Sequence, residues 1–293
     1  LSVLTLAGTP VAQWMTAGPD VAFVPSAVAV APGSGDVYVV SDVPHRVDRF
    51  GADGTWYGGW GGEGTGPGQL LGPQGIAVHP DGRVLVADFR NARLQAFSAT
   101  GAFLVERPLL GIRDVAVSAD GSRIYTLHNA PGGFGDRDYV TVFASDLAVE
   151  LETFAAASLP FEDSFRPAGS LAVTDAGRLA LSTAFGPRRM HGVRQYAPQP
   201  GGSWSLAAST VADPLAFGGF LDPTALATGP DGSLYLTEAT QDVTRHYAPD
   251  GAFLGILANA RGDELAVGRA GDLYLVSTTA DVVLHKVAAD GSP

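Results

Sequence analysis

The side chains best suited to chemistry are His128, Glu238, Asp263 and Glu264, because they interrupt a pattern that the rest of the chain repeats. Oxygen-rich sets hold Ca²⁺ or Mg²⁺, and a set with histidine also suits Zn²⁺. Glu238, Asp263 and Glu264 are therefore candidate ligands of a divalent cation (Ca, Mg or Zn). His128, Glu238 and Arg113 are catalytic candidates, with Arg113 stabilising developing negative charge. The alternative is a structural role for all five, so no catalytic residue is assigned.

A second group of residues suits binding. Four long segments carry phenylalanine and arginine, which are enriched at interfaces, and loops on rigid scaffolds often carry function. The alternative is that the rings pin long loops to the fold. The segments are residues 129–138, 157–166, 184–191 and 213–221. The candidate binding residues for a protein partner or small ligand are Gln74, Arg113, His128, Phe134, Phe185, Arg188, Phe220 and Asp263.

Several chemistries are excluded by residue types and spacing. Cysteine is absent, so the chain has no disulfide, thiolate metal site or cysteine nucleophile. The 6 histidines fall at non-equivalent places in the repeated pattern, which argues against a three-histidine zinc site. The glycine-rich run 58–64 does not lead into a helix, so we interpret it as a loop and not as a phosphate cradle.

The elements that position these residues are short strands in a unit repeated about six times. Each unit has an apolar run, a glycine turn, a second apolar run ending in a polar residue, and a third run ending in a bulky residue. The runs are rich in valine, leucine and tyrosine, which is typical of strands, and such periods indicate propellers or arrays. The turn glycines, spaced by 47, 39, 56, 55 and 39 residues, are Gly35, Gly82, Gly121, Gly177, Gly232 and Gly271.

The repeat predicts an all-β fold, a six-bladed β-propeller with four-stranded antiparallel blades, in one domain over residues 1–293. We expect an N-terminal strand, Ser2–Leu6, to close the last blade, because the sequence ends at a turn where a fourth strand is still missing. The expected blades are residues 25–60, 73–106, 111–154, 167–209, 223–257, and 262–293 together with 1–7.

In such a ring, the starts of the innermost strands and the ends of the second strands open onto one face, where propellers bind ligands. The innermost strands begin at Ser26, Gln74, Arg113, Gly169, Thr224 and Asp263, followed by Ala27, Gly75, Asp114, Ser170, Ala225 and Glu264. The second strands end at Asp42, Asp88, His128, Thr183, Glu238 and Ser277. The predicted ring is rich in carboxylates, and any divalent cation is expected in the central channel.

One stretch of the sequence resembles a known repeat. Residues 61–70, followed by Pro-Gln-Gly-Ile-Ala-Val at 73–78, look like the inter-blade loop and first strand of an NHL repeat. The match extends through Val86–Asp88, Asn91, Arg93–Gln95 and Phe97. The chain is thus similar to the NHL-repeat six-bladed β-propellers.

The resemblance also implies roles for two acidic residues. In an NHL blade, the acid after the second strand accepts hydrogen bonds from turn amides and from an arginine of the third strand. This implies structural pairs of Asp42 with Arg46 and of Asp88 with Arg93.

The net charge of −12 is spread over the chain, and its 18 lysines and arginines form no basic stripe. Nucleic-acid binding and attachment to an anionic membrane are therefore not expected. No long apolar run predicts membrane insertion. The first residue is Leu1, which favours a processed chain and an extracytoplasmic location (secreted, periplasmic or surface-anchored).

Three functions fit these observations. The first is a non-catalytic extracytoplasmic NHL-type propeller that acts as a protein- or ligand-binding scaffold, as a module or subunit of a larger assembly. The second is a metal-dependent, lactonase-like hydrolase or lyase with its site at the top of the channel. The third is a sensor or carbohydrate-binding domain of a longer receptor. We favour the first.

Overall fold

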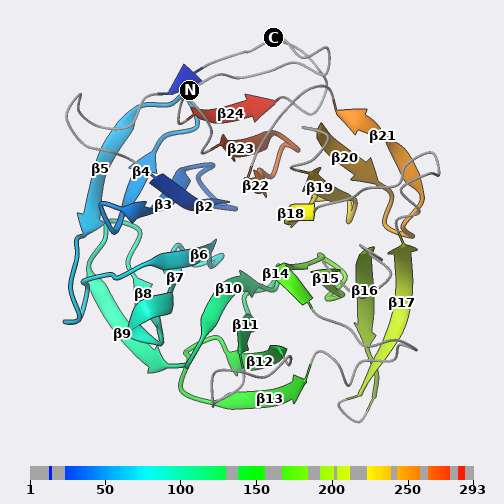
Figure 1. Ribbon diagram of the computed structural model, residues 1–293, viewed down its shortest axis with the longest axis horizontal. Helices are drawn as coiled ribbons and strands as arrows, with labels where there is room; N and C mark the ends of the chain where they lie inside the picture. The colour runs from blue at the N-terminus through cyan, green and yellow to red at the C-terminus, as the bar shows by residue number, and fades with distance from the viewer. Residues whose placement is uncertain are drawn as a thin grey trace.

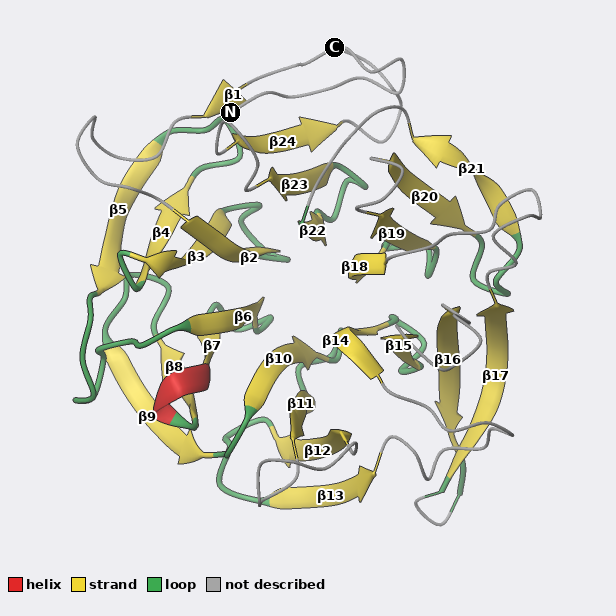
Figure 2. Ribbon diagram, viewed as in Figure 1, coloured by secondary structure: helices red, strands yellow, loops and turns green. Residues whose placement is uncertain are grey.

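The described part of the chain is almost entirely β-structure. The computed structural model describes residues 13–14, 24–129, 138–155, 167–183, 192–200, 203–211, 223–238, 243–257, 263–277 and 283–287. In these ranges the strands form four-stranded sheets set radially around a central channel, which confirms the predicted all-β propeller (Figures 1 and 2). The one helical element there is the short 3-10 turn η1 (Phe89–Asn91). None of the described segments forms a helix long and apolar enough to cross a membrane.

Five blades are each built from four consecutive antiparallel strands. The first two are β2 (Val24–Val30), β3 (Val37–Val43), β4 (Arg46–Phe50) and β5 (Trp56–Gly61), then β6 (Pro73–Val78), β7 (Val84–Asp88), β8 (Arg93–Phe97) and β9 (Phe103–Pro108). The third is β10 (Ile112–Val117), β11 (Arg123–Asn129), β12 (Asp138–Ala144) and β13 (Glu150–Ala155). The last two are β14 (Pro167–Val173), β15 (Leu179–Thr183), β16 (Gly192–Pro198) and β17 (Trp204–Val211), then β18 (Pro223–Thr228), β19 (Leu234–Glu238), β20 (Val243–Tyr247) and β21 (Phe253–Leu257).

The remaining sheet is smaller and corrects the prediction of six equivalent blades. It joins β22 (Glu264–Val267), β23 (Leu273–Ser277) and β24 (Val283–Val287) to β1 (Gln13–Trp14), in the order β1-β24-β23-β22. The described pairing of β1 is limited to Gln13 with His285 and Trp14 with Leu284. The ring therefore has five complete blades and one short closing sheet. Among the described residues, the strand that completes this sheet is β1. The predicted closing strand, Ser2–Leu6, lies outside the described residues.

The glycine turns between first and second strands form as predicted. All six glycines have φ between +70° and +92°, a left-handed conformation that costs glycine little. In the second blade, the Gly82 amide donates to the His79 carbonyl at 2.8 Å. The recurring glycine in the sequence is thus the position that reverses the chain between the innermost strand and its neighbour.

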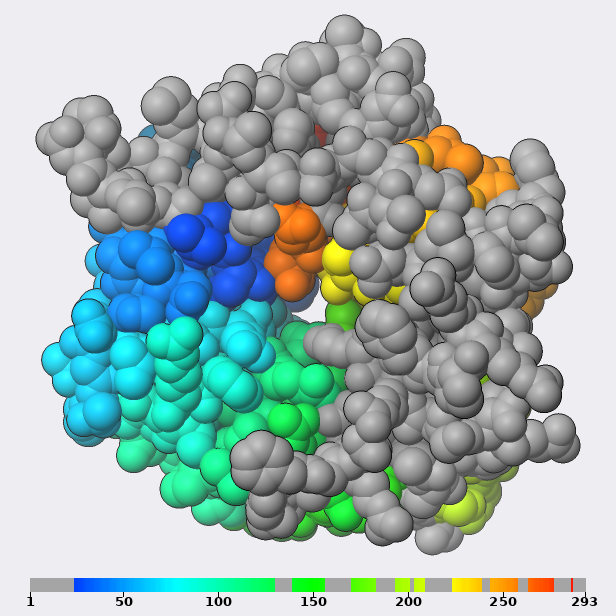
Figure 3. Space-filling model, in the orientation of Figure 1, coloured from blue at the N-terminus to red at the C-terminus, as the bar shows by residue number. Residues whose placement is uncertain are grey.

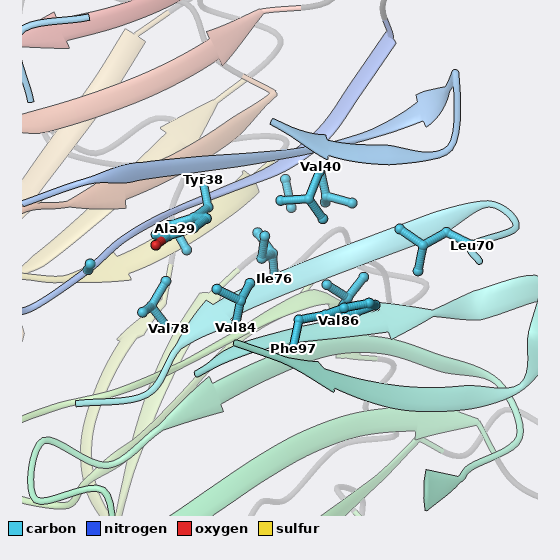
Figure 4. Close-up of a cluster of buried hydrophobic side chains, with 12 residues drawn as sticks. Ala29, Tyr38, Val40, Leu70, Ile76, Val78, Val84, Val86 and Phe97 are labelled. Atoms are coloured by element: carbon cyan, nitrogen blue, oxygen red, sulfur yellow. The ribbon is translucent and has the colours of Figure 1, made fainter. Parts of the chain in front are cut away.

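The hydrophobic core lies between neighbouring sheets. Between the first two blades, Tyr38 and Val40 of β3 pack against Ile76 of β6 and Val84 and Val86 of β7 (Figure 4). The Trp60 ring packs against this cluster, with its centroid 6.0 Å from that of Tyr38 and 6.1 Å from that of Phe97. Each blade therefore buries its apolar side chains only by contacting the next blade.

The bulky residues that end the third strands belong to this inter-blade packing, as predicted. In the described blades they are almost completely buried, which fixes the spacing between sheets. These residues are Phe50, Phe97, Phe143, Tyr196 and Tyr247.

Truncating one of these rings should therefore destabilise the protein strongly. We expect Phe97→Ala to lower the free energy of unfolding by roughly 3–5 kcal/mol, the usual cost of removing a buried aromatic ring. The matched control is Leu104→Ala on β9, where the side chain is 48% exposed and the expected change is below about 0.5 kcal/mol. Urea unfolding followed by tryptophan fluorescence measures both values, and similar values would contradict the assignment of Phe97 to the core.

Candidate functional site

A polar cavity of about 230 Å³ lies where the innermost strands begin. Its described lining contains only polar and charged side chains, and each of the six innermost strands contributes at least one. Figure 3 shows a face of the molecule that is hollowed at its centre, where these strands converge. The lining residues are Ser26 (β2), Gln74 (β6), Arg113 and Asp114 (β10), Ser170 (β14), Thr224 (β18) and Glu264 (β22).

In three blades, the innermost strand has a β-bulge at its first lining residue. On β2, β6 and β10 the register with the second strand skips one residue, so Ser26, Gln74 and Arg113 have no direct partner in the ladder. A bulge bends the strand and redirects a side chain. In each case the redirected side chain lines the cavity.

The same positions also tie neighbouring blades together. Side chains at the start of one innermost strand form hydrogen bonds with the backbone of the next innermost strand. These bonds run from Ser26 Oγ to Pro73 O (2.6 Å), from Leu171 N to Asp114 Oδ2 (2.8 Å) and from Leu226 N to Ser170 Oγ (3.2 Å). Three lining side chains are therefore fixed by hydrogen bonds to the neighbouring blade.

The second and third blades meet too closely for a side chain at Gly75. A Cβ atom built there would lie 2.8 Å from both the Arg113 carbonyl oxygen and the Asp114 Cα. Because both contacts are with backbone, they cannot be relieved by a rotamer change. Gly75 thus allows β10 to bring Arg113 and Asp114 to the channel.

Two carboxyl groups in the cavity have perturbed acidities. Burial raises the pKa of Asp114 to about 7, against the lowering effects of amide hydrogen bonds from Leu171 and Val115, the Ser170 hydroxyl and the Arg113 charge. Burial also raises the pKa of Glu264 well above its usual value, and the charges of Asp114 and Asp263 raise it further. Both groups therefore hold their protons to a higher pH than an exposed carboxyl group does.

A second, wider cavity of about 570 Å³ is lined by later residues of the same innermost strands and by the turns that follow them. Aliphatic residues such as Val28, Ile76 and Leu171 dominate its lining, with Asp175 and Arg269 among the charged residues. Because convergent polar groups give a site its specificity, we assign the candidate site to the smaller cavity.

His128 is buried within the third blade. Its Nε2 lies 2.8 Å from Thr141 Oγ1, its Nδ1 lies 3.2 Å from the Asn129 carbonyl oxygen, and its ring stacks on Tyr139. His128 is not among the residues that line the polar cavity. Its described contacts are those of a structural histidine.

Glu238 is also buried, and it accepts a hydrogen bond from Arg245 Nε at 3.0 Å. The structure therefore places Glu238 in an ion pair within the fifth blade, and Glu238 is not among the described residues that line the polar cavity. Asp263 precedes Glu264 and acts on it through its charge. Among the described residues, no three histidine, aspartate or glutamate side chains gather as a metal site, and a divalent cation stays a prediction.

The predicted pair of Asp88 and Arg93 is confirmed. Both residues are buried, and Arg93 Nε donates to Asp88 Oδ2 at 2.8 Å. Asp88 Oδ1 also accepts the Leu71 amide at 2.7 Å, and Arg93 donates to the carbonyls of Gly66 and Gln69. The pair thus anchors the glycine-rich loop before β6.

The predicted pair of Asp42 and Arg46 is wrong. Arg46 Nε donates instead to Asp48 Oδ2 at 2.8 Å, two residues along β4. Asp42 Oδ1 lies 3.7 Å from His45 Nδ1. In the first blade, the arginine that begins the third strand thus pairs with Asp48 of the same strand. In the second blade, the equivalent arginine pairs with Asp88 at the end of the second strand.

Of the other predicted binding residues, Gln74 and Arg113 line the cavity, whereas Phe134, Phe185, Arg188 and Phe220 lie outside the described residues. Asp114, Ser170 and Thr224 line it too, but were not chosen as candidates. Their place at strand starts was evident from the sequence. Nothing in the sequence distinguished a polar residue aimed at the channel from one that caps a turn.

His79 forms a serine–histidine–aspartate triplet elsewhere in the ring. Its Nε2 lies 3.0 Å from Ser145 Oγ, and its Nδ1 lies 2.7 Å from Asp81 Oδ1. However, Nε2 also lies 2.8 Å from the Gly121 carbonyl oxygen, which can only accept a hydrogen bond. Nε2 therefore donates to the third blade, and the triplet joins two blades instead of activating the serine.

The radial sheets and the polar cavity at one end of the channel define this chain as a β-propeller. Residues 70–97, in the second blade, match the family model of the NHL repeat. The resemblance to an NHL repeat is thus confirmed in the second blade, and the chain is a β-propeller that contains an NHL repeat.

Solved structures with similar folds differ widely in function. A gluconolactonase from Xanthomonas campestris is 17% identical over 91% of this chain and 87% of its own, with a TM-score of 0.63. Kuenenia stuttgartiensis hydrazine synthase is 12% identical over 94% of this chain and 100% of its own (TM-score 0.62), and a chain of a nidogen/laminin complex is 13% identical over 93% and 87% (TM-score 0.60). The comparison with curated proteins finds no match. At these identities the likeness shows the fold alone.

The close approach at Gly75 predicts a cost for the smallest possible side chain. Gly75→Ala should lower the free energy of unfolding by about 1–3 kcal/mol, the usual cost of overpacking. Gly33→Ala is the control, because a Cβ atom there meets no atom within 4 Å. Equal unfolding midpoints for the two variants in urea would show that the second and third blades do not meet as described.

The raised pKa of Asp114 predicts a pH-dependent stability. Folded Asp114 keeps its proton up to about pH 7, whereas an unfolded aspartate releases it near pH 4. Its contribution to stability is therefore fully present below about pH 4 and is lost as the pH rises to about 7. Asp114→Asn should remove this fall, which urea unfolding at a series of pH values measures.

The control for this experiment is Asp120, whose pKa is shifted in the opposite direction to that of Asp114. Hydrogen bonds from Ser118 and Ser122 lower the pKa of Asp120 to about 2. Its contribution is present above about pH 4 and is lost as the pH falls towards 2. Asp120→Asn should therefore change the free energy of unfolding only in the acidic part of the pH profile. Parallel profiles for wild type and Asp114→Asn would contradict the assigned acidity of Asp114.

Proposed function

We propose that this protein is a non-catalytic, ligand-binding NHL-type propeller whose site is the polar cavity at the end of the channel. The observation that carries the proposal is that all six innermost strands supply a polar side chain to one small cavity. Convergent polar groups in a concave, preformed site are the usual signature of ligand recognition. The inter-blade hydrogen bonds support it further, because a site held rigidly before binding loses less entropy when a ligand enters.

The arrangement favours binding over catalysis. Each Asp114 oxygen already accepts a backbone amide, from Val115 at Oδ1 and from Leu171 at Oδ2. The described lining has no histidine, lysine or tyrosine, so Asp114 and Glu264 are its only candidates for a general acid or base. The hydroxyl groups of Ser26 and Ser170 are already hydrogen-bonded to the backbone of the next blade, which is not the environment of an activated nucleophile. Because enzymes and members of protein complexes share this fold, the function has to be argued from the site and not from the fold. An extracytoplasmic location and a protein partner stay predictions.

Filling the cavity tests this proposal. A thermal-shift screen of small metabolites should find compounds that raise the melting temperature of the wild-type protein, as expected when a ligand binds only the folded state. Gln74→Trp should abolish these shifts by occupying the cavity. The matched control is Gln199→Trp, at an exposed turn after β16, which should keep them. Shifts that persist in Gln74→Trp, or no shift with any compound, would overturn the proposal.

A further inference from the structure

The charges of the cavity narrow the class of ligand, if the proposed function holds. Its lining combines two carboxyl groups, Asp114 and Glu264, with one guanidinium group, Arg113. The other lining side chains are neutral hydroxyl and amide groups. A site with charged groups of both signs is complementary to a ligand that itself carries both signs.

The two carboxyl groups come from opposite sides of the ring. β10 and β22 belong to the third blade and to the closing sheet, and they face each other across the central channel (Figures 1 and 2). The Asp114 charge nevertheless acts on Glu264, so the two groups share one electrostatic environment. A ligand cation between them relieves this like-charge repulsion.

Arg113 favours a zwitterion over a simple ion as the ligand of the cavity. It adjoins Asp114 on β10 and lines the same cavity, and its guanidinium group matches a carboxylate through paired N–H donors. A bare cation would be attracted by the two carboxylates but repelled by Arg113. A bare anion would be attracted by Arg113 but repelled by the carboxylates. A zwitterion satisfies both charged parts of the lining.

The volume limits the size of the ligand. At about 230 Å³, the cavity holds the volume of about eight liquid water molecules, each about 30 Å³. This is smaller than the sites of about 300–1,000 Å³ that take drug-sized molecules. A free amino acid with a short side chain fits this volume, whereas a sugar chain or a peptide does not.

We propose that the cavity binds a small zwitterion of amino-acid size, with its ammonium group between Asp114 and Glu264 and its carboxylate on Arg113. Gln74 on β6 and Thr224 on β18, which lie opposite each other across the channel (Figure 1), are placed to hydrogen-bond the rest of the ligand. The inference rests on the proposed function, since it names the ligand class of the same site.

Isothermal titration calorimetry of the full chain near pH 8 tests the ligand class. The probes are glycine, β-alanine and γ-aminobutyrate, which differ only in the separation of their charges, with propylamine as the cation alone and propionate as the anion alone. We expect one zwitterion to bind at least tenfold more tightly than either half-probe. This comparison uses only the wild-type protein, so it does not depend on the folding of a variant.

Two variants test which side chain binds which charged group of the ligand. Glu264→Gln should weaken zwitterion binding about tenfold. Arg113→Gln should remove the preference for the zwitterion, so that propylamine binds at least as tightly as β-alanine. Gln199→Trp serves as the control outside the cavity.

The outcomes separate the two proposals. Propylamine or propionate binding as tightly as every zwitterion to the wild-type protein would overturn the zwitterion but leave a ligand site in the cavity. The same conclusion follows if no probe binds while the metabolite screen finds a ligand that Gln74→Trp excludes. If neither experiment finds a ligand, both the zwitterion and the proposed function fail.

Discussion

The structure depends on the contact between neighbouring innermost strands. No blade has an apolar core of its own, because residues such as Tyr38 and Phe97 are buried only between sheets. At the channel, where the strands are closest, polar side chains take over this connection. Asp114 accepts a backbone amide of the fourth blade, and Ser26 donates to a carbonyl of the second. Ser26, Asp114 and Ser170 can be placed there because each is hydrogen-bonded to the next innermost strand.

The same constraint explains the site. Three of the residues that line the cavity, Ser26, Asp114 and Ser170, also join neighbouring blades through hydrogen bonds. Burial in that cavity then shifts the acidity of Asp114 and Glu264. The contacts that hold the blades together thus also place polar side chains around the channel, which is the arrangement on which the proposed ligand site depends.

Much of the fold could be predicted from the sequence, because its signals are local. The turn glycines and the bulky strand ends recur visibly, and each acts within its own unit. That an N-terminal strand completes the last sheet was predicted, but the identity of β1 was not, since the pairing of β1 with β24 joins segments about 270 residues apart and depends on long-range register.

The site was predicted in part. The strand starts were located, but which acids face the channel depends on inter-blade geometry. Glu238 ends its strand as Asp88 does, and only the structure shows that Arg245 pairs with it. The pair of Asp48 and Arg46 was also missed, because the sequence pattern predicted Asp42 as the partner of Arg46.

The closing sheet has a consequence for substitutions at the channel. β1 completes this sheet by pairing with β24, and its innermost strand, β22, which carries Glu264, packs between β2 and β18. A ring of strands has no free inner edge, so a shift of β22 has to be accommodated by the strands on both of its sides. A substitution at Glu264 should therefore perturb the first and the fifth blade together, although β2 and β18 lie far apart in the sequence.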